Sequence, residues 1–187
     1  MVKLNRIYTR TGDDGTTGLA DGTRRAKDDP RIIAIGSVDE TNAALGLVRL
    51  YSDTDGLDAL LARLQNDLFD LGADLATPSD EISWKPLRIR AEQVTALEEA
   101  LDAYNADLAP LDSFVLPAGT SLSAHLHLAR TCARRAERDA VTLSKMGDEA
   151  VNPEAVKYLN RLSDLLFVLS RYANDKGRGD VKWVPSA

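Results

Sequence analysis

The stretch LDALLARLQNDLFDLGADL, residues 57–75, carries the clearest structural signal in the sequence. Its leucines recur three and four residues apart, and this spacing places them on one stripe of an α-helix. The stripe consists of Leu57, Leu60, Leu61, Leu64, Leu68, Leu71 and Leu75. An apolar stripe of this kind must pack against other elements, so it predicts a core built from helices.

Four other segments have the helical period, and turn-forming residues separate them. They cover residues 31 to about 52, 94–108, 121 to about 146, and 153 onward. Gly46 is the weak point of the first segment, because glycine disfavours a helix interior. Since the connections are short and no convincing strand pattern occurs, we predict an all-α protein, a five-helix antiparallel bundle.

The starts of the last two helices are marked by capping residues. Thr120 or Ser121 can cap the helix that ends near Gly147. Asn152 can cap the final helix, and Pro153 is tolerated in its first turn. The expected inward positions of this helix are Val156, Leu159, Leu162, Leu166 and Leu169.

The chain of 187 residues has the length of one ordinary domain. Residues 6–30 are rich in Gly, Thr, Asp and Arg and lack a sustained period, so we expect an ordered loop there. We therefore divide a single domain, residues 1–187, into an N-terminal loop over 1–30, a helical bundle over 31–176 and an irregular tail over 177–187.

Composition excludes several functional classes. A net charge of −6 argues against a nucleic-acid-binding surface, and charged residues interrupt every apolar segment that could enter a membrane. The single Cys132 allows no internal disulfide and gives no reason to expect an oxidising compartment, so we expect a cytoplasmic protein. His125 and His127 point to different faces of a helix, so we expect no metal site there.

Residues 9–18, TRTGDDGTTG, form the first candidate binding segment, followed by Arg24, Arg25 and Lys27. Closely spaced glycines let backbone amides converge on an anion, threonines add hydroxyl donors, and basic residues neutralise charge, as a phosphate cradle requires. A solvent-exposed turn or hairpin has the same composition, and composition alone favours it. Neither GxxxxGK[ST] nor GxGxxG occurs in the segment, so a P-loop and a dinucleotide-binding fold are not supported.

Residues 129–138, ARTCARRAER, form the second candidate segment. Arg130, Arg134 and Arg138 are four residues apart and stack on one helix face, where like charges repel unless an anion lies among them. Glu137 could instead pair with Arg134 in a solvated ion pair. The spacing favours neither phosphate binding nor surface pairing over the other.

Three further positions interrupt apolar patterns or precede a helix. Asp39 lies near an apolar stripe, where a buried carboxylate would need a partner such as Arg130, although a polar helix edge explains it equally simply. Phe114 stands in FVLPAGT and could be an ordinary core residue before a turn. Asn160 interrupts the stripe of the final helix.

The candidate segments occur together and in order, which is far more specific than any of them alone. The chain resembles the PduO-type ATP:cob(I)alamin adenosyltransferases over nearly its whole length. The resemblance rests on YTRTGDDGTTGL (8–19), RRAKDDPRIIAIGSVDETNAALG (24–46), FVLPAGTSLSAHLHLARTCARRAER (114–138) and YLNRLSDLLFVLSR (158–171). It implies a five-helix bundle assembled as a homotrimer, with active sites at the subunit interfaces.

The resemblance also implies roles for particular residues. The N-terminal loop would wrap the ATP triphosphate through Thr9, Arg10, Thr11, Gly12, Asp13, Gly15, Thr16, Thr17, Gly18 and Lys27. Arg134, Glu137 and Asn160 would hold the nucleotide and its phosphates, and Mg²⁺ would be bound through those phosphates without direct protein ligands. Asp39 and Arg130 would form an inter-subunit ion pair beside the corrinoid. Phe114 would cover the lower face of the cobalt and displace the dimethylbenzimidazole base.

The implied reaction is transfer of the 5′-deoxyadenosyl group of ATP to the cobalt of cob(I)alamin, giving adenosylcobalamin and triphosphate. Cobalt is then the nucleophile, so no catalytic histidine is needed. A reductase and a B12-dependent acceptor enzyme are possible partners. A non-enzymatic, ATP-gated corrinoid carrier is the alternative. Ala118, Arg10 and Thr41 depart from the family pattern, and Ala118 bears on the fit of the corrinoid pocket because glycine is usual there.

Overall fold

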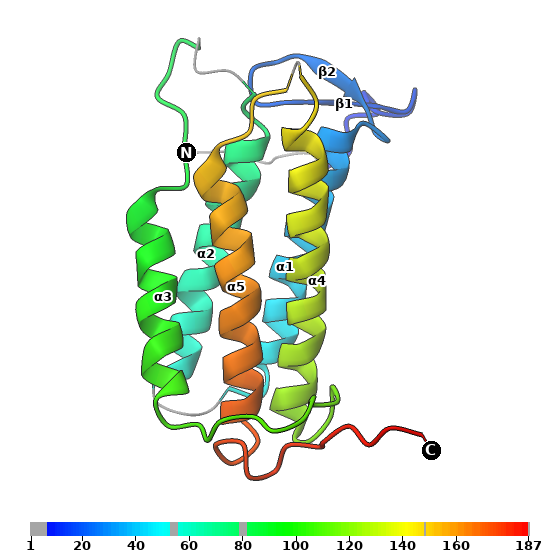
Figure 1. The fold of residues 1–187 in the computed structure, drawn as a ribbon. Coiled ribbons are helices and arrows are strands. Elements are labelled where there is room, and N and C mark those ends of the chain that lie inside the picture. Colours follow the sequence, from blue (N-terminus) through cyan, green and yellow to red (C-terminus); the bar gives the residue numbers. More distant parts are fainter. Residues whose placement is uncertain (1–6, 53–55, 79–81, 148, 187) are drawn as a thin grey trace.

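The computed structural model describes residues 7–52, 56–78, 82–147 and 149–186, and five helices dominate this part of the chain. They are α1 (Pro30–Arg49), α2 (Leu57–Leu75), α3 (Ala91–Asn105), α4 (Ser121–Ser144) and α5 (Pro153–Tyr172). Consecutive helices run in alternating directions along the bundle (Figure 1). The predicted all-α, five-helix antiparallel architecture is therefore confirmed.

The leucine stripe of α2 forms the middle of the core. All its members are buried except Leu60, which is half-buried. Burying one leucine side chain contributes about 1.5–3 kcal/mol, so this stripe is a main source of stability. α1 packs on α2 and α4, and α5 packs on α3 and α4. The α4 stripe of buried alanines at positions 129, 133, 136 and 140 gives its neighbours room to pack closely.

The helix starts agree with the capping residues, and some helix ends differ from the prediction. Thr120, not Ser121, caps α4, and its Oγ1 accepts from the Ser123 amide at 3.1 Å. Asn152 caps α5 through a hydrogen bond from the Glu154 amide. The first helix ends at Arg49 rather than near residue 52, and the third ends at Asn105, before Leu108. No described helix is long and apolar enough to cross a membrane.

A short hairpin corrects the expectation of a structure without strands. Strand β1 (Thr16–Gly18) pairs antiparallel with β2 (Arg24–Ala26), with Thr17 opposite Arg25. Three-residue strands are too short to show a two-residue period in sequence, which explains the miss. The hairpin lies at the end of the bundle where α1 and α5 begin (Figure 1). Buried Leu19 and a 3.0 Å hydrogen bond from the Ala20 amide to the Ala76 carbonyl attach it there.

The opposite end of the bundle is closed by the C-terminal residues (Figure 1). The Leu116 amide donates to the Val181 carbonyl and the Trp183 amide donates to the Phe114 carbonyl, both at 2.8 Å. Part of the segment expected to be irregular thus pairs with residues 114–116, and Val115 and Lys182 form a β-bridge. Single β-bridges leave no sequence pattern, because one pair of residues has no period.

Candidate functional site

A cavity of about 530 Å³ lies between α4 and α5. It is lined by Arg134, Glu137, Arg138, Val141, Thr142 and Asn160. Three of the residues expected to hold the nucleotide therefore meet at one place, although 26 positions of sequence separate the first from the last. Residues three and four apart on one helix face come together by helical geometry alone, but Asn160 joins them only through the packing of α5 on α4.

Hydrogen bonds orient the polar side chains of this cavity. Asn160 Nδ2 donates to Glu137 Oε1 at 2.9 Å, and Arg161 Nη1 donates to Asn160 Oδ1 at 2.6 Å. Arg161 is itself held by Glu98 on α3 at 2.8 Å. The surface pair between Arg134 and Glu137, one of the two alternatives that the spacing left open, is absent from the described residues. Arg134 therefore remains exposed, and its charge is available to an anion.

The N-terminal loop is ordered by its own polar groups. Asp14 Oδ1 accepts from the Thr16 amide at 2.9 Å and from Thr16 Oγ1 at 2.7 Å. These hydrogen bonds hold the pKa of Asp14 below its usual value, with a smaller effect from Arg24. Arg24 Nε also donates to Thr16 Oγ1 at 2.9 Å. The Thr16 hydroxyl is therefore occupied in bracing the loop.

Gly12 brings Lys27 close to the loop backbone. A Cβ atom at this position would lie 2.9 Å from the Thr16 carbonyl oxygen and 3.2 Å from Lys27 Nζ, so a side chain would displace one of them. Gly15 has a φ of +83°, a region that favours glycine. Two of the loop glycines, Gly12 and Gly15, are therefore required by close packing and by backbone conformation respectively.

The other loop residues expected to bind phosphate point toward solvent or are only half-buried. The exposed ones are Thr9, Arg10, Thr11, Asp13, Gly15 and Gly18, and Gly12, Thr16 and Thr17 are half-buried. Thr9 Oγ1 and Thr11 Oγ1 share a hydrogen bond of 2.9 Å. None of these loop residues lines the cavity between α4 and α5. One chain therefore presents two separate groups of residues for the nucleotide.

Asp39 and Arg130 do not meet within one chain in the described ranges. Asp39 is exposed, and among the described residues it is the only charged one that lines an apolar groove of about 390 Å³ between α1 and α2. Arg130 is half-buried on α4, and its Nε atom is buried without a hydrogen-bond partner in the part of the chain that the structure describes. Burial, and then the neighbouring Arg134, lowers the pKa of Arg130. A buried guanidinium nitrogen normally has a hydrogen-bond partner, so the Arg130 side chain can still accept one more polar group.

Phe114 is not a core residue of the single chain, since 77% of it is exposed. Its ring contacts Trp183 edge-on, with centroids 6.1 Å apart. The two aromatics line a cavity of about 560 Å³ together with Leu111, Asp112, Ser113 and Pro185. Trp183 was not identified from the sequence as a site residue. An aromatic residue in a segment without a period gives no indication that it packs against residue 114.

The backbone around Phe114 is fixed by a buried amide. Asn174, 2% exposed, accepts from the Thr120 amide at 3.0 Å and donates to the Ala118 carbonyl at 3.2 Å. Gly119 has a φ of +112°, and a Cβ there would lie 2.2 Å from Asn174 Oδ1. Glycine is therefore required at position 119, whereas the alanine at position 118 contributes only its carbonyl to this clamp.

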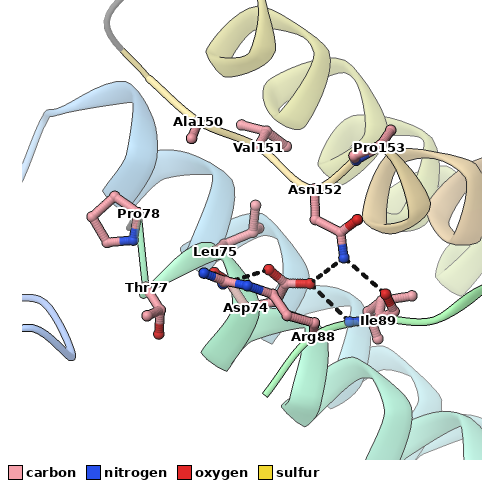
Figure 2. Close-up of a pocket in the computed structure, with 10 residues that line it drawn as sticks. All are labelled: Asp74, Leu75, Thr77, Pro78, Arg88, Ile89, Ala150, Val151, Asn152 and Pro153. Atoms are coloured by element: carbon pink, nitrogen blue, oxygen red, sulfur yellow. Dashed lines mark hydrogen bonds and ion pairs between the residues drawn. The ribbon is translucent and has the colours of Figure 1, made fainter. Parts of the chain in front are cut away.

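The largest cavity described, about 620 Å³, contains none of the expected site residues. Figure 2 shows the buried Asp74 carboxylate at its centre, accepting from Arg88, the Ile89 amide and Asn152 at 2.7–2.8 Å. The polar contacts in this view join the end of α2, the α2–α3 connection and the start of α5 to one another, including a 2.8 Å hydrogen bond from Asn152 to the Ile89 carbonyl. The cluster joins structural elements and is fully hydrogen-bonded, so it does not compete with the α4–α5 cavity as a binding site.

The fold and the clustered basic and polar residues define a helical protein with a candidate anion-binding site. The model of the cobalamin adenosyltransferase family matches residues 7–173. The chain belongs to this family.

Similar proteins agree with the family match. A corrinoid adenosyltransferase of Mycobacterium tuberculosis is 55% identical over 187 residues, covering 98% of this chain and 95% of that protein. The corrinoid adenosyltransferase PduO of Salmonella typhimurium is 44% identical, and the match covers 88% of this chain and 48% of that protein. A phenylalanine-to-histidine variant of a PduO-type ATP:corrinoid adenosyltransferase from Lactobacillus reuteri, solved with cobalamin and ATP, superposes with a TM-score of 0.89. It is 38% identical and covers 97% of this chain and 98% of that one.

Proposed function

We propose that this chain transfers the 5′-deoxyadenosyl group of ATP to the cobalt of cob(I)alamin, giving adenosylcobalamin and triphosphate. Membership of the cobalamin adenosyltransferase family over residues 7–173 is the observation that carries the proposal. The cavity that gathers Arg134, Glu137 and Asn160 supports its nucleotide half.

The reaction moves one electron pair at each end of the transferred carbon. The cob(I)alamin substrate supplies the pair that forms the cobalt–C5′ bond, and the C5′–O bond breaks as its pair leaves with triphosphate. No proton transfer by a side chain is needed. The protein therefore contributes orientation of the two substrates and stabilisation of the leaving charge.

The leaving triphosphate is held by the N-terminal loop and the α4–α5 cavity. Those backbone amides and hydroxyls of residues 9–18 that make no hydrogen bond within the loop, together with Lys27, provide donors for phosphate oxygens. Arg134 adds a charge-assisted donor from α4, since no described carboxylate occupies it. Glu137 is the one carboxylate among the cavity residues, and its Oε1 is already hydrogen-bonded by Asn160. This donor set fits a Mg²⁺ ion held mainly by phosphate oxygens, which would neutralise part of the leaving charge.

Phe114 supplies the corrinoid half of the site. An exposed aromatic ring in edge-on contact with Trp183 can press on the lower face of cobalt and exclude the dimethylbenzimidazole base. Removing that base makes cob(II)alamin easier to reduce, because an axial donor stabilises the higher oxidation state. Asp39 and Arg130 would lie beside the corrinoid.

A homotrimer would unite these parts. Along α4, Arg134 lies about 20 Å from the Thr120 cap beside the Phe114 segment, at 1.5 Å per residue. The hairpin lies at the opposite end of the bundle from the connection between α3 and α4, to which Phe114 belongs (Figure 1). Exposed Ile33 and Leu47 on α1, with Leu50 at its C-terminal cap, offer an apolar face to another subunit, as Leu128 does on α4. An ion pair between Asp39 of one subunit and Arg130 of the next would satisfy the orphaned Arg130 Nε.

Further partners follow from the reaction. Cob(I)alamin must be generated by a reductase, and adenosylcobalamin must be passed to a B12-dependent enzyme. The single cysteine, Cys132, is buried, which suits action in a reducing cytoplasm.

One spectroscopic assay tests the function. Protein, ATP and chemically reduced cobalamin are mixed, and the light-sensitive spectrum of adenosylcobalamin is followed. We expect its formation with one triphosphate released per turnover. Binding of both substrates without this product would identify a carrier instead, and binding of neither would reject both functions.

A further inference from the structure

The two adjacent arginines of β2 have different surroundings. Arg24 contacts Thr16 and the Thr11 carbonyl within the loop. Arg25 instead contacts Glu149 in the α4–α5 connection at 2.8 Å. Successive side chains of a strand point to opposite faces, so the hairpin register decides which arginine meets the bundle. Sequence alone could not separate the two.

Glu149 is a buried junction between distant segments. Its side chain is 4% exposed, and its Oε2 atom accepts from Arg31 Nε at 2.9 Å and Nη2 at 2.6 Å. Its Oε1 atom pairs with Arg25. Arg31, itself buried, also donates to the Leu75 carbonyl at 2.7 Å and the Ala150 carbonyl at 2.8 Å. The hairpin and α1 therefore meet the α4–α5 connection at this carboxylate, and Arg31 links the same cluster to the end of α2.

The hairpin needs such an anchor because it cannot hold its own position. A two-stranded hairpin is marginally stable at best by itself, and this one has three residues per strand. Leu19 and the Ala20 amide attach one side of it. Arg25 attaches the other side, through Glu149 and, at 3.4 Å, through Asp29 at the start of α1. The Lys27 and Gly12 contact that shapes the loop lies just after this second attachment.

We propose that Glu149 is a positioning residue for ATP, acting through Arg25 to hold the N-terminal loop in its phosphate-binding arrangement. The inference rests on the proposed function of that loop. Glu149 holds Arg25 away from the triphosphate and fixes the strand from which Lys27 extends. Losing the carboxylate releases the hairpin, so its effect falls on ATP binding and not on the corrinoid or on the bond-forming step.

Glu149→Gln tests this with Asp74→Asn as the matched control. Both carboxylates are buried at the same end of the bundle and pin the same connection, but Asp74 contacts Arg88, Ile89 and Asn152, none of them in the hairpin (Figure 2). We expect both variants to lower the unfolding midpoint. Only Glu149→Gln should raise the KM for ATP, by about tenfold, with kcat and the KM for cobalamin within twofold of the parent. An equal rise in both variants would overturn the proposal.

Arg25→Met keeps the test decisive if Glu149→Gln folds poorly. Arg25 is one-third exposed and its loss leaves the Arg31–Glu149 pair in place, so the fold should survive. We expect the same rise in the KM for ATP, and no further rise in the double variant, because both changes break one interaction. A parent-like KM in Arg25→Met, or additive effects, would contradict the proposal. Absence of turnover in the parent would instead reject the proposed function itself.

Discussion

Each end of the bundle has a buried ion pair that fixes a non-helical segment, but the two pairs join residues at very different separations in the sequence. At the hairpin end, the buried Arg31–Glu149 pair joins residues 118 positions apart. At the Phe114 end, the buried Arg171–Asp180 pair joins residues nine positions apart. The first pair holds a loop of glycines, hydroxyls and cations, and the second holds a turn that leaves an aromatic ring exposed.

The difference corresponds to the two proposed substrates. A polyanion requires many donors that converge, so the loop must be fixed against several helices at once. The lower face of a corrinoid requires one apolar ring in a fixed position beneath it, so local contacts that fix residues 114–120 are sufficient. The following predictions test whether the two ends are separable, beginning with the largest expected effect.

Breaking the clamp at the Phe114 end should have the largest effect on stability. Arg171→Ala leaves the Asp180 carboxylate, 2% exposed, without its cation, and removes the donor to the Ala109 carbonyl. Removing one partner of a buried pair costs about 3–5 kcal/mol of unfolding free energy. Chemical denaturation should detect this loss. The control is Lys182→Ala at the same end, whose exposed pair with Asp112 should contribute no measurable stability, and equal losses in both variants would contradict the prediction.

Phe114→Ala should separate chemistry from folding. Because the ring is largely exposed in the single chain, we expect little change in the unfolding midpoint. Activity with cobalamin should fall by on the order of 100-fold, comparable to losing a group that acts only on the reacting centre.

Cobinamide distinguishes this role of Phe114 from a packing role. It lacks the dimethylbenzimidazole base and should partly escape the defect. If the variant still gives the four-coordinate cob(II)alamin spectrum with ATP bound, the assigned role is wrong.

Arg134→Ala should affect the nucleotide and spare the corrinoid. The variant removes a charge-assisted donor from the α4–α5 cavity, which is worth about 1.5–3 kcal/mol and corresponds to a rise of about 10- to 150-fold in the KM for ATP. Initial rates at varied ATP and fixed cobalamin measure it. An unchanged ATP dependence would remove Arg134 from the nucleotide site.

The smallest expected effect is a pH dependence from His127. Burial lowers its pKa, assisted by Arg130 and opposed by Asp180, and neither ring nitrogen has a hydrogen-bond partner among the described residues. The unfolded chain therefore binds a proton before the native protein does. Stability is fully present above the ordinary pKa of 6.5 and declines as pH falls below it, by at most about 1.4 kcal/mol per pH unit.

Denaturation between pH 5 and 7 isolates this effect, since only histidine titrates there at its ordinary pKa. His127→Gln should flatten the decline. An identical slope in that variant would assign the proton to another group.

The sequence by itself determined the helices, because their apolar period repeats over many residues. It also placed the caps at Thr120 and Asn152, since a cap needs only its neighbours. Helical spacing brought Arg134 and Glu137 to one face of α4. The family motifs then indicated the substrates, and the family comparison agrees.

The tertiary structure decided which residues meet across elements. It joined Asn160 to Glu137, exposed Phe114 against Trp183, and directed Arg25 but not Arg24 to Glu149. None of these contacts produces a repeating pattern in the sequence. Each joins single residues from segments far apart in the chain or follows from the register of one strand. Local sequence patterns predict helices and caps because these depend on residues close together in the chain. Contacts between distant segments form only when the helices pack.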